Sequence, residues 1–482
     1  MGREPRYVEH VLAPRYAFGR REELPYLLDV LVAHTLMLRR QRIVTPESAA
    51  ATLRALTAVT PEALPPYDPR YEDIYFAVED RVAQATGGIG EFRLALSRND
   101  AWAALIRLML RDQGLALVEH LDDVREALLD QAVRHRDTLM LAHTHQQYAQ
   151  PTTVGHYLLA AAATVGRCVD RYHDALARLD RSPLGAGALT TTGFPIDRTY
   201  TAALLGFAGI VENSYDAVVA ADHVAELAGC HAALATSLGR IVQDLLGWAS
   251  SEVGALELAA GFIQISSIMP QKRNPVALEH VRSALSRLLG ACLGIWASAH
   301  NVPFEDVNDP ADDAVPLLVE THRALGGTLA VLRAAIASAT IRGDAWAPAL
   351  RGTFATSTEL ADTLVREGGL GFPEAHAAVA RLVEDRRRQG RGFAEVTPDE
   401  IETAALAAAG RRVRLSLETI ARAIDPRSFV SSRTIPGGPG PQAVGAMLDS
   451  TRATLATSRK TTRAVRDRVA AARARRGMEA SA

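Results

Sequence analysis

The feature that most constrains this chain is a set of long helix-forming stretches in its middle. They cover residues 101–135, 153–180, 214–250, 277–300 and 313–341. Apolar residues recur in them at helical intervals, as at Leu227, Leu234 and Leu238. Each stretch is far longer than an average helix of about three turns. Helices this long and this apolar predict a bundle whose outer faces are also covered, and therefore an oligomer.

Composition also predicts an all-α fold. Aromatic residues are only 5% of the 482 residues, whereas sheets favour β-branched and aromatic side chains. We expect three domains: a mixed helical N-terminal domain over 1–100, a central long-helix bundle over 101–345, and a small helical C-terminal domain with a basic tail over 346–482. Polar loops are expected between the long helices, at 142–152, 182–198, 261–275 and 301–312.

Charge and cysteine content exclude several classes of function. The 53 Lys and Arg residues against 55 Asp and Glu residues give a net charge of −2, so no basic field is expected to hold nucleic acid. Cys168, Cys230 and Cys292 are far apart and form no CxxC pair, which is typical of a reducing compartment. There is no signal-type apolar segment and no apolar run long enough to span a membrane. We expect a cytoplasmic protein that binds neither nucleic acid nor membrane.

Three polar segments lie in the connections between the apolar helices. They are Ser97-Arg98-Asn99-Asp100, Thr144-His145-Gln146-Gln147 and Ser266-Ser267-Ile268-Met269-Pro270-Gln271-Lys272-Arg273-Asn274-Pro275. Loops on a rigid scaffold commonly carry function. In the third segment Lys272 is suited to stabilising negative charge beside a serine that acts as base or nucleophile. Taken alone, the segment fits an ordinary polar connection between helices equally well.

The ordered set of motifs resembles a known family. SSIMPQKRNP (266–275) is similar to the fumarase/aspartase superfamily signature, GSSxMPxKxNP. Together with SRND (97–100) and THQQYAQP (144–151), it resembles the argininosuccinate lyase branch. Further matches follow in order, among them PLGAGAL (183–189) and ELADTLVREG (359–368). The similarity runs from about residue 70 to about residue 445, and the order of the motifs makes chance an implausible explanation.

This resemblance implies a carbon–nitrogen lyase that reversibly eliminates fumarate from an N-substituted L-aspartate. A base removes a proton beside one carboxylate, and the charge spreads into that carboxylate as an aci-carboxylate dianion. The C–N bond then breaks and an acid protonates the leaving nitrogen. The implied fold is a three-domain, nearly all-helical protomer, four of which join their central helices in a homotetrameric core whose active sites each use loops of three chains. No cofactor is expected, and no metal, since His143 and His145 lack a third ligand.

The chemistry requires fixed donors and a cation, because a carbon acid beside a carboxylate is weak and its dianion must be stabilised. By motif position, the resemblance makes Ser266 the base, supported by Lys272 and loop amides. It makes His145 the group that orients or protonates the leaving side, with Glu279 as its carboxylate partner. The remaining expected site residues bind substrate: Ser97, Arg98, Asn99, Thr144, Gln147, Asn274, Tyr75, His300, Glu305 and Asn308.

Departures from the family pattern gather where the leaving group is expected to bind. Ile265 replaces a glycine, Leu96 an arginine and Tyr75 a histidine. Further along, Glu305 replaces a glutamine and Asn308 a lysine. Loss of a cation and gain of an acid favour a leaving group that ends in an amine rather than a carboxylate. We therefore expect an N-substituted aspartate other than argininosuccinate, for which ethylenediamine disuccinate is a precedent in this branch.

Three alternatives stay open at this point. The first is an authentic argininosuccinate lyase of arginine biosynthesis. The second is a catalytically silent structural homologue, like the lens crystallins of this branch, and the third is a nucleic-acid binder that uses the basic stretch after Arg459. The joint presence of Ser266, Lys272 and His145 argues against a silent homologue. A solvated helix face is the simpler interpretation of the basic stretch. For Arg98, an interhelix ion pair and a substrate-carboxylate anchor are equally well supported.

Overall fold

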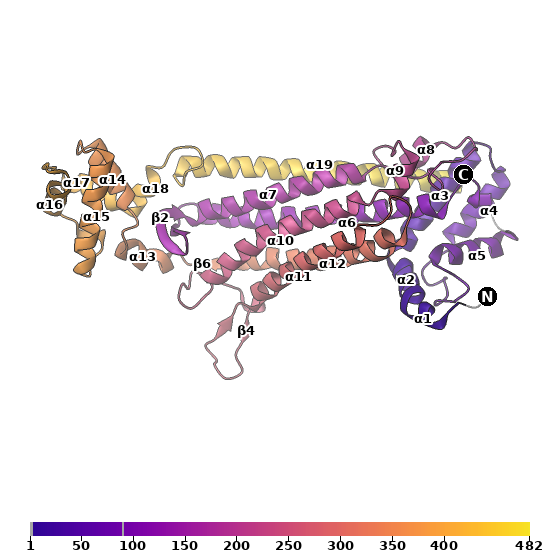
Figure 1. The fold of residues 1–482 in the computed structure, drawn as a ribbon, viewed down its shortest axis with the longest axis horizontal. Coiled ribbons are helices and arrows are strands. Elements are labelled where there is room, and N and C mark those ends of the chain that lie inside the picture. Colours follow the sequence, from indigo (N-terminus) through magenta and orange to yellow (C-terminus); the bar gives the residue numbers. More distant parts are fainter. Residues whose placement is uncertain (1–2, 89–90) are drawn as a thin grey trace.

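A computed structural model describes residues 3–88 and 91–482, and it is almost entirely helical (Figure 1). This confirms the predicted all-α fold. The long helices of the centre lie side by side as one bundle because each buries an apolar stripe against its neighbours. They are α6 (Arg98–Arg134), α7 (Val154–Leu179), α10 (Asp222–Trp248), α11 (Val276–Ala299) and α12 (Val315–Ser338).

One predicted helix is divided. The stretch 214–250 forms α9 (Ser214–Val219) and α10, separated at Ala220, whose backbone is extended with ψ 119°. Alanine favours helix, so the break does not come from local propensity. Instead, α9 contacts α6, and tertiary packing overrides the local preference. The expectation of a single continuous helix here was wrong.

The expected loop 142–152 was also wrong, because this segment forms most of an antiparallel hairpin. Strand β1 (Leu139–Thr144) pairs with β2 (Gln147–Thr153), and Thr144 lies opposite Gln147. The two turn residues, His145 and Gln146, have φ values of 52° and 60°. Two-residue hairpin turns with positive φ usually carry Asn or Gly. Neither is present, so the sequence lacks the usual hairpin signal.

The N-terminal region packs α3 (Leu24–Arg40), α4 (Pro46–Thr57) and α5 (Ile74–Thr86) at one end of the bundle. Local signals set these helix ends. The Thr45 side chain accepts a hydrogen bond from the Ser48 amide at 3.2 Å, as expected of an N-cap before Pro46. This end also contains the short helices α1 (Pro5–Tyr7) and α2 (Ala13–Phe18).

The range 346–482 contains two structural parts. The first comprises six short helices: α13 (Ala347–Gly352), α14 (Ser357–Arg366), α15 (Phe372–Arg388), α16 (Pro398–Ala409), α17 (Leu417–Ile424) and α18 (Pro426–Ser431). Of these, α14 to α17 enclose a hydrophobic core separate from that of the bundle. The second is α19 (Pro441–Ser481), which returns along α6 and α7 to the N-terminal end (Figure 1). Arg459 and Arg466 of α19 form ion pairs with Glu126 and Glu119 of α6.

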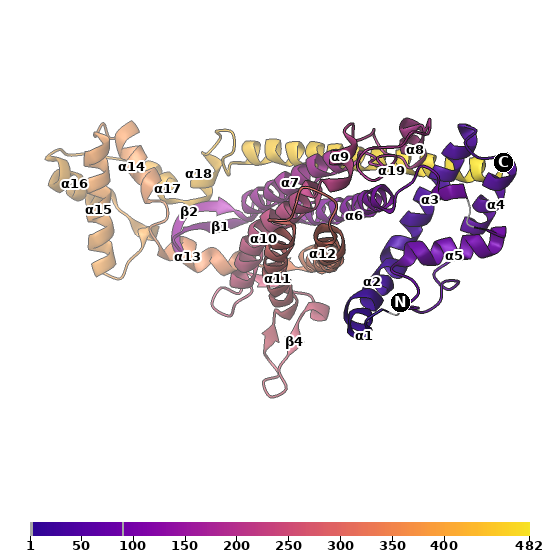
Figure 2. The ribbon, with the colours of Figure 1, turned by 45° about the vertical axis from the view of Figure 1, so that its right-hand side comes forward.

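A thin excursion leaves the side of the bundle between α10 and α11. It holds β4 (Gln264–Ile265) and β5 (Arg273–Asn274), which pair with each other, and it projects outward in both views (Figures 1 and 2). Within residues 3–88 and 91–482, no helix is long and apolar enough to cross a membrane. Those same ranges contain no group of three or more His, Cys, Asp or Glu side chains placed to hold a metal ion.

Candidate active site

The SRND segment is the start of α6. Ser97 caps the helix by accepting a hydrogen bond from the Asn99 amide at 3.2 Å, and Asp100 accepts one from the Ser97 amide at 3.0 Å. The buried Asp100 carboxylate also accepts the Gly185 amide at 2.7 Å. This cap ties the PLGAGAL segment to the helix and fixes Arg98 and Asn99 in the first turn.

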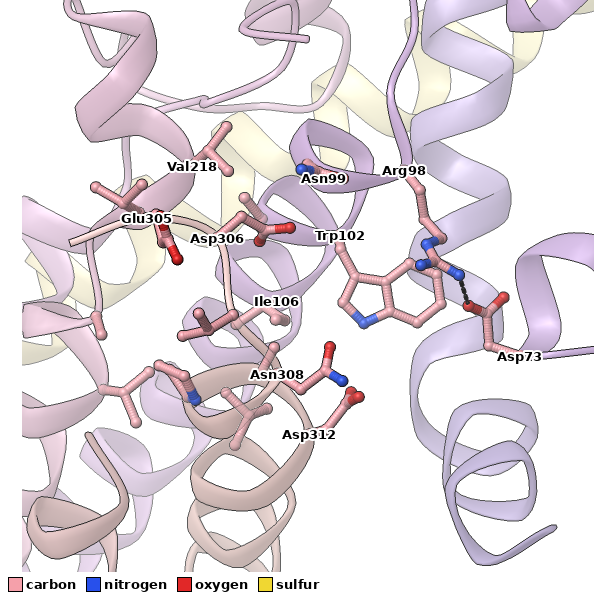
Figure 3. A pocket seen from close by; sticks show the side chains of 18 of the residues that line it. Asp73, Arg98, Asn99, Trp102, Ile106, Val218, Glu305, Asp306, Asn308 and Asp312 are labelled. Carbon is pink, nitrogen blue, oxygen red and sulfur yellow. Dashed lines mark hydrogen bonds and ion pairs between the residues drawn. The ribbon is translucent and has the colours of Figure 1, made fainter. Parts of the chain in front are cut away.

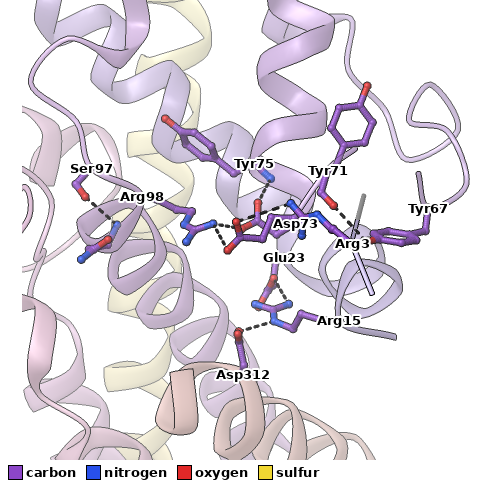
Figure 4. A network of polar contacts seen from close by, with 12 residues as sticks. Arg3, Arg15, Glu23, Tyr67, Tyr71, Asp73, Tyr75, Ser97, Arg98 and Asp312 are labelled. Atoms are coloured by element: carbon purple, nitrogen blue, oxygen red, sulfur yellow. Dashed lines mark hydrogen bonds and ion pairs between the residues drawn. The ribbon is translucent and has the colours of Figure 1, made fainter. Parts of the chain in front are cut away.

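Arg98 forms ion pairs rather than standing free. Its guanidinium lies 2.8 Å from an oxygen of Asp73 and 3.1 Å from one of Glu72, both just before α5 (Figure 4). Burial raises the pKa of Asp73, while Arg98 opposes that rise. The structure therefore contains the interhelix ion pair that was one of the two interpretations of Arg98.

A cavity opens beside this helix start. Including its mouth it encloses about 1190 Å³, and it lies between the first turns of α6, the α9–α10 junction and the segment 305–315. Four expected substrate-binding residues line it together: Arg98, Asn99, Glu305 and Asn308. Sequence reasoning missed other lining residues, among them Arg15, Trp102, Arg107, His223, Asp306 and Asp312. Trp102 and Arg107 follow Asn99 at helical spacings of three and eight, a signal that was available.

Most cations of this cavity are already neutralised. Arg15, 10% exposed, lies 2.8 Å from Glu23 and 2.6 Å from Asp312 (Figure 4). Burial raises the pKa of Glu23 to about 7 even though Arg15 opposes the shift. The Arg15–Asp312 contact joins α2 to the turn just before α12, 297 residues along the chain. Local sequence patterns carry no signal of such a pair.

The hairpin presents Thr144, His145 and Gln147 to solvent. His145 is held in the left-handed region, with φ 52°, a conformation that costs a non-glycine residue about 1–2 kcal/mol. Such strain often marks functional positions. Figure 1 places the hairpin at the end of the bundle opposite to the SRND helix start.

The 264–274 excursion contains the remaining signature residues. The Ser266 hydroxyl oxygen accepts hydrogen bonds from the amides of Met269 at 3.1 Å and Ile268 at 3.3 Å. Lys272 is exposed and Asn274, in β5, is partly exposed. Ile265 stands in the family's glycine position and pairs with Arg273 in the short ladder. The excursion is held by backbone pairing and by the Arg273 side chain, which donates to the Leu258 carbonyl at 3.3 Å and lies 3.4 Å from Glu257.

Three expected site residues belong to neither the cavity, nor the hairpin, nor the 264–274 excursion. Glu279 is in the first turn of α11 and exposed, and His300 is exposed at the end of that helix. Tyr75 is buried in the first turn of α5, and burial raises its pKa to about 12. One chain thus brings together the SRND residues with Glu305 and Asn308, but places neither the hairpin nor the excursion beside them (Figures 1 and 2).

Comparison with known proteins agrees with the motif order. A family model described as "Lyase" matches residues 78–290, and one described as "Argininosuccinate lyase C-terminal" matches residues 354–431. Argininosuccinate lyase of Methanothermobacter thermautotrophicus is 35% identical over 436 residues, covering 90% of this chain and 93% of that protein. The chain belongs to the argininosuccinate lyase family. It is a carbon–nitrogen lyase of the fumarase/aspartase superfamily.

Other members of the family and superfamily extend the likeness. Argininosuccinate lyase 1 of Shouchella clausii is 32% identical over 454 residues, covering 93% of this chain and 91% of that one. A crystal structure of EDDS lyase in complex with formate superposes with a TM-score of 0.86 at 31% identity, covering 100% of this chain and 96% of that chain. A fumarate lyase from Mesorhizobium sp. BNC1, at 19% identity and a TM-score of 0.73 (92% of this chain, 98% of that one), shares the fold.

Proposed function

We propose that this enzyme reversibly eliminates fumarate from an N-substituted L-aspartate. The base takes the proton from the carbon beside one carboxylate, the C–N electron pair leaves with nitrogen, and that nitrogen gains a proton. The products are fumarate and an amine. The observation that carries this proposal is the Ser266 hydroxyl oxygen, which accepts two backbone amides inside the superfamily signature.

Ser266 acts as the base in this proposal. A serine is a poor base unless its oxyanion is stabilised. The Ile268 and Met269 amides supply two donors, and the Lys272 ammonium follows in the same loop. Donors aimed at developing charge are the largest single contribution in many enzymes. Lys272 therefore supports both the serine oxyanion and the dianion of the substrate.

In this proposal the hairpin supplies the groups that act on the leaving nitrogen. His145 orients or protonates the departing nitrogen, and Glu279 holds its ring in one tautomer. The exposed position of His145 at a strained turn supports its contact with a ligand. The remaining donors to the substrate carboxylates in this proposal are Ser97, Asn99, Thr144, Gln147 and Asn274.

A homotetramer is the assembly that unites these groups. In one chain the hairpin, the excursion and the SRND turn are separated (Figures 1 and 2), so the proposed site needs segments of three chains. Large apolar side chains support such assembly: Ile265 is 72% exposed, Ile268 83% and Leu293 of α11 60%. A groove between α10 and α11, lined in part by Leu285 and Leu289, continues this apolar face.

The remaining expectations are proposed with the same function. We retain 1–100, 101–345 and 346–482 as domains, with α19 packed along the second. Cys168, Cys230 and Cys292 are free and buried, which supports a reducing, cytoplasmic location. The ion pairs of Arg459 and Arg466 with α6 balance the basic stretch within the chain. This favours a structural role for that stretch over nucleic-acid binding.

A panel of N-substituted aspartates tests the function. Fumarate release, followed by its absorbance, is expected for at least one member, and fumarate with the matching amine is expected to give the reverse reaction. Argininosuccinate belongs in the panel because the named relatives at 32–35% identity are argininosuccinate lyases. A clear preference for it would identify an authentic argininosuccinate lyase. If Ser266→Ala and the unmodified enzyme are equally inactive on every member, the chain is a silent structural homologue.

A further inference from the structure

We propose that the first turn of α14 holds the His145 hairpin in its working position, and that Gln150 and His156 are positioning residues for His145. The inference rests on the proposed function, in which His145 acts on the leaving nitrogen, and adds the groups that place it there. Two series of contacts run from the hairpin and the helix that follows it into α13 to α18. Both end at neighbouring residues of α14, Thr358 and Glu359.

The hairpin has little to hold it beyond its own strands. It has only two of them, and a two-stranded hairpin is at most marginally stable by itself in water. Its turn carries His145 in a strained conformation, and residues 143–148 are exposed. Among the described residues, none from the hairpin lines the cavity at the SRND turn (Figure 3). The position of His145 therefore depends on what the base of the hairpin contacts.

The base of the hairpin lies between the end of the bundle and the helices α13 to α18 (Figures 1 and 2). Strand β1 contacts α13, and strand β2 contacts α18. From β2, the Gln150 side-chain amide donates a hydrogen bond of 3.1 Å to the hydroxyl oxygen of Thr358. Thr358 lies in the first turn of α14. The first series of contacts thus joins the hairpin directly to a helix 208 residues further along the chain.

The second series of contacts passes through His156, in the first turn of α7. Its amide donates to the Thr153 hydroxyl oxygen at 3.1 Å, which caps the helix. Its Nε2 lies 3.0 Å from the Gly437 carbonyl oxygen, which can only accept, so Nε2 bears the proton. In the neutral ring Nδ1 then accepts the hydroxyl of Thr152 in β2, 2.8 Å away. One imidazole therefore joins the base of the hairpin to the turn that follows α18.

The turn that contains Gly437 is itself fixed to α14. It begins just after Arg433, whose guanidinium pairs with Glu359 and whose carbonyl oxygen accepts the Gly440 amide at 3.2 Å. Glu359 is buried and directly follows Thr358. Both series of contacts therefore converge on one helical turn, and a displacement of that turn would loosen the hairpin from both.

Thr358→Val tests the direct contact, because it removes the hydroxyl oxygen that accepts from Gln150 and keeps the shape of the side chain. With an N-substituted aspartate that releases fumarate, kcat is expected to fall about tenfold and KM to change about twofold at most, since a small displacement of a catalytic group lowers the rate more than it weakens binding. Thr358→Ser is the matched control. It retains the hydroxyl group and should retain kcat.

Thr152→Val tests the contact with His156 in the same way, because it removes the hydroxyl that donates to Nδ1. It should also lower kcat about tenfold, and Thr152→Ser should not. Combining each valine variant with His145→Asn separates positioning from a general structural role. A residue that acts only through His145 should lower kcat no further once the imidazole is gone. Equal further losses in both backgrounds would show a general structural role and would overturn the inference.

Hydrogen–deuterium exchange over residues 139–153 separates failure of this inference from failure of the proposed function. Without substrate, the hairpin amides should exchange faster in Thr358→Val than in Thr358→Ser. Unchanged exchange would overturn the support by α14, and faster exchange with an unchanged kcat would overturn its role in positioning His145. If exchange rises but no N-substituted aspartate releases fumarate, the lyase proposal fails and the support of the hairpin by α14 stands.

Discussion

The SRND cavity and the two exposed segments differ in how their polar groups are held. In the cavity, Arg98 is paired with Asp73, 25 residues away, and Arg15 with Asp312, 297 residues away, before any ligand arrives. At the hairpin and the 264–274 excursion, backbone turns hold His145 and Ser266, and the side chains face solvent. One region is thus organised by a single chain, whereas the other contains the proposed catalytic groups, which meet between neighbouring copies only in the proposed homotetramer.

The largest effect is expected at the excursion. Ser266→Ala should lower kcat by about 10²- to 10⁴-fold, the usual contribution of a general base, with little change in KM because binding determinants remain. The neighbouring Ser267→Ala is the matched control and should retain most activity. Steady-state fumarate kinetics measure both. Equal losses in the two variants would mean that the loop, rather than the Ser266 oxygen, is required.

Mixing inactive subunits tests whether the exposed segments of different copies meet. Ser266→Ala and His145→Asn homo-oligomers should each be nearly inactive, since each lacks one group in every site. After joint refolding, some sites of the mixed oligomers contain an intact Ser266 and an intact His145 from different chains, and partial fumarate formation should return. If joint refolding yields mixed oligomers of the expected mass without activity, the shared site is wrong.

In the cavity region, removing one member of an ion pair is expected to lower the free energy of unfolding. Arg15→Met removes the partner of the fully buried Glu23, and an unpaired buried charge destabilises a protein by about 3–5 kcal/mol. The folded-state pKa of Glu23, already about 7, should rise further above its ordinary value of 4.5. Up to about pH 7 this carboxyl is largely protonated in both folded proteins, so the loss of stability caused by Arg15→Met should be smallest there. It should grow as pH rises from about 7 toward the higher folded-state pKa of the variant.

Urea unfolding of both proteins across this pH range measures the difference. The Met side chain keeps most of the apolar contact of the Arg15 stem, so packing changes little. A loss of stability that does not depend on pH would show that the ion pair is not its source.

The smallest effect is expected at the hairpin turn. Gln146→Gly removes backbone strain at φ 60° and should raise the free energy of unfolding by at most about 1 kcal/mol. His145→Gly should relieve strain to a similar degree but abolish most activity, because it removes the imidazole. Thermal unfolding and fumarate kinetics of this matched pair separate the two roles of the turn. Full activity in His145→Gly would remove His145 from the mechanism.

Elements with local signals were predictable. Thr45 and Pro46 mark a helix start through one capping interaction, and the apolar spacing of the central helices is a property of consecutive residues. The hairpin was missed because His145 and Gln146 occupy positions that usually need Asn or Gly. The break at Ala220 was missed because α9 is redirected by packing on α6 rather than by its own residues.

The sequence by itself determined the helical architecture, the family and the order of its motifs, because these depend on residue identity and short spacings. Only the tertiary structure decided that Arg15 meets Glu23 and Asp312, and that Asp306 joins Glu305 in the cavity beside the SRND turn. It also resolved Arg98 into an ion pair with Asp73. The reason is that electrostatic partners act through distances in space, and the chain's path brings together residues that no local pattern connects.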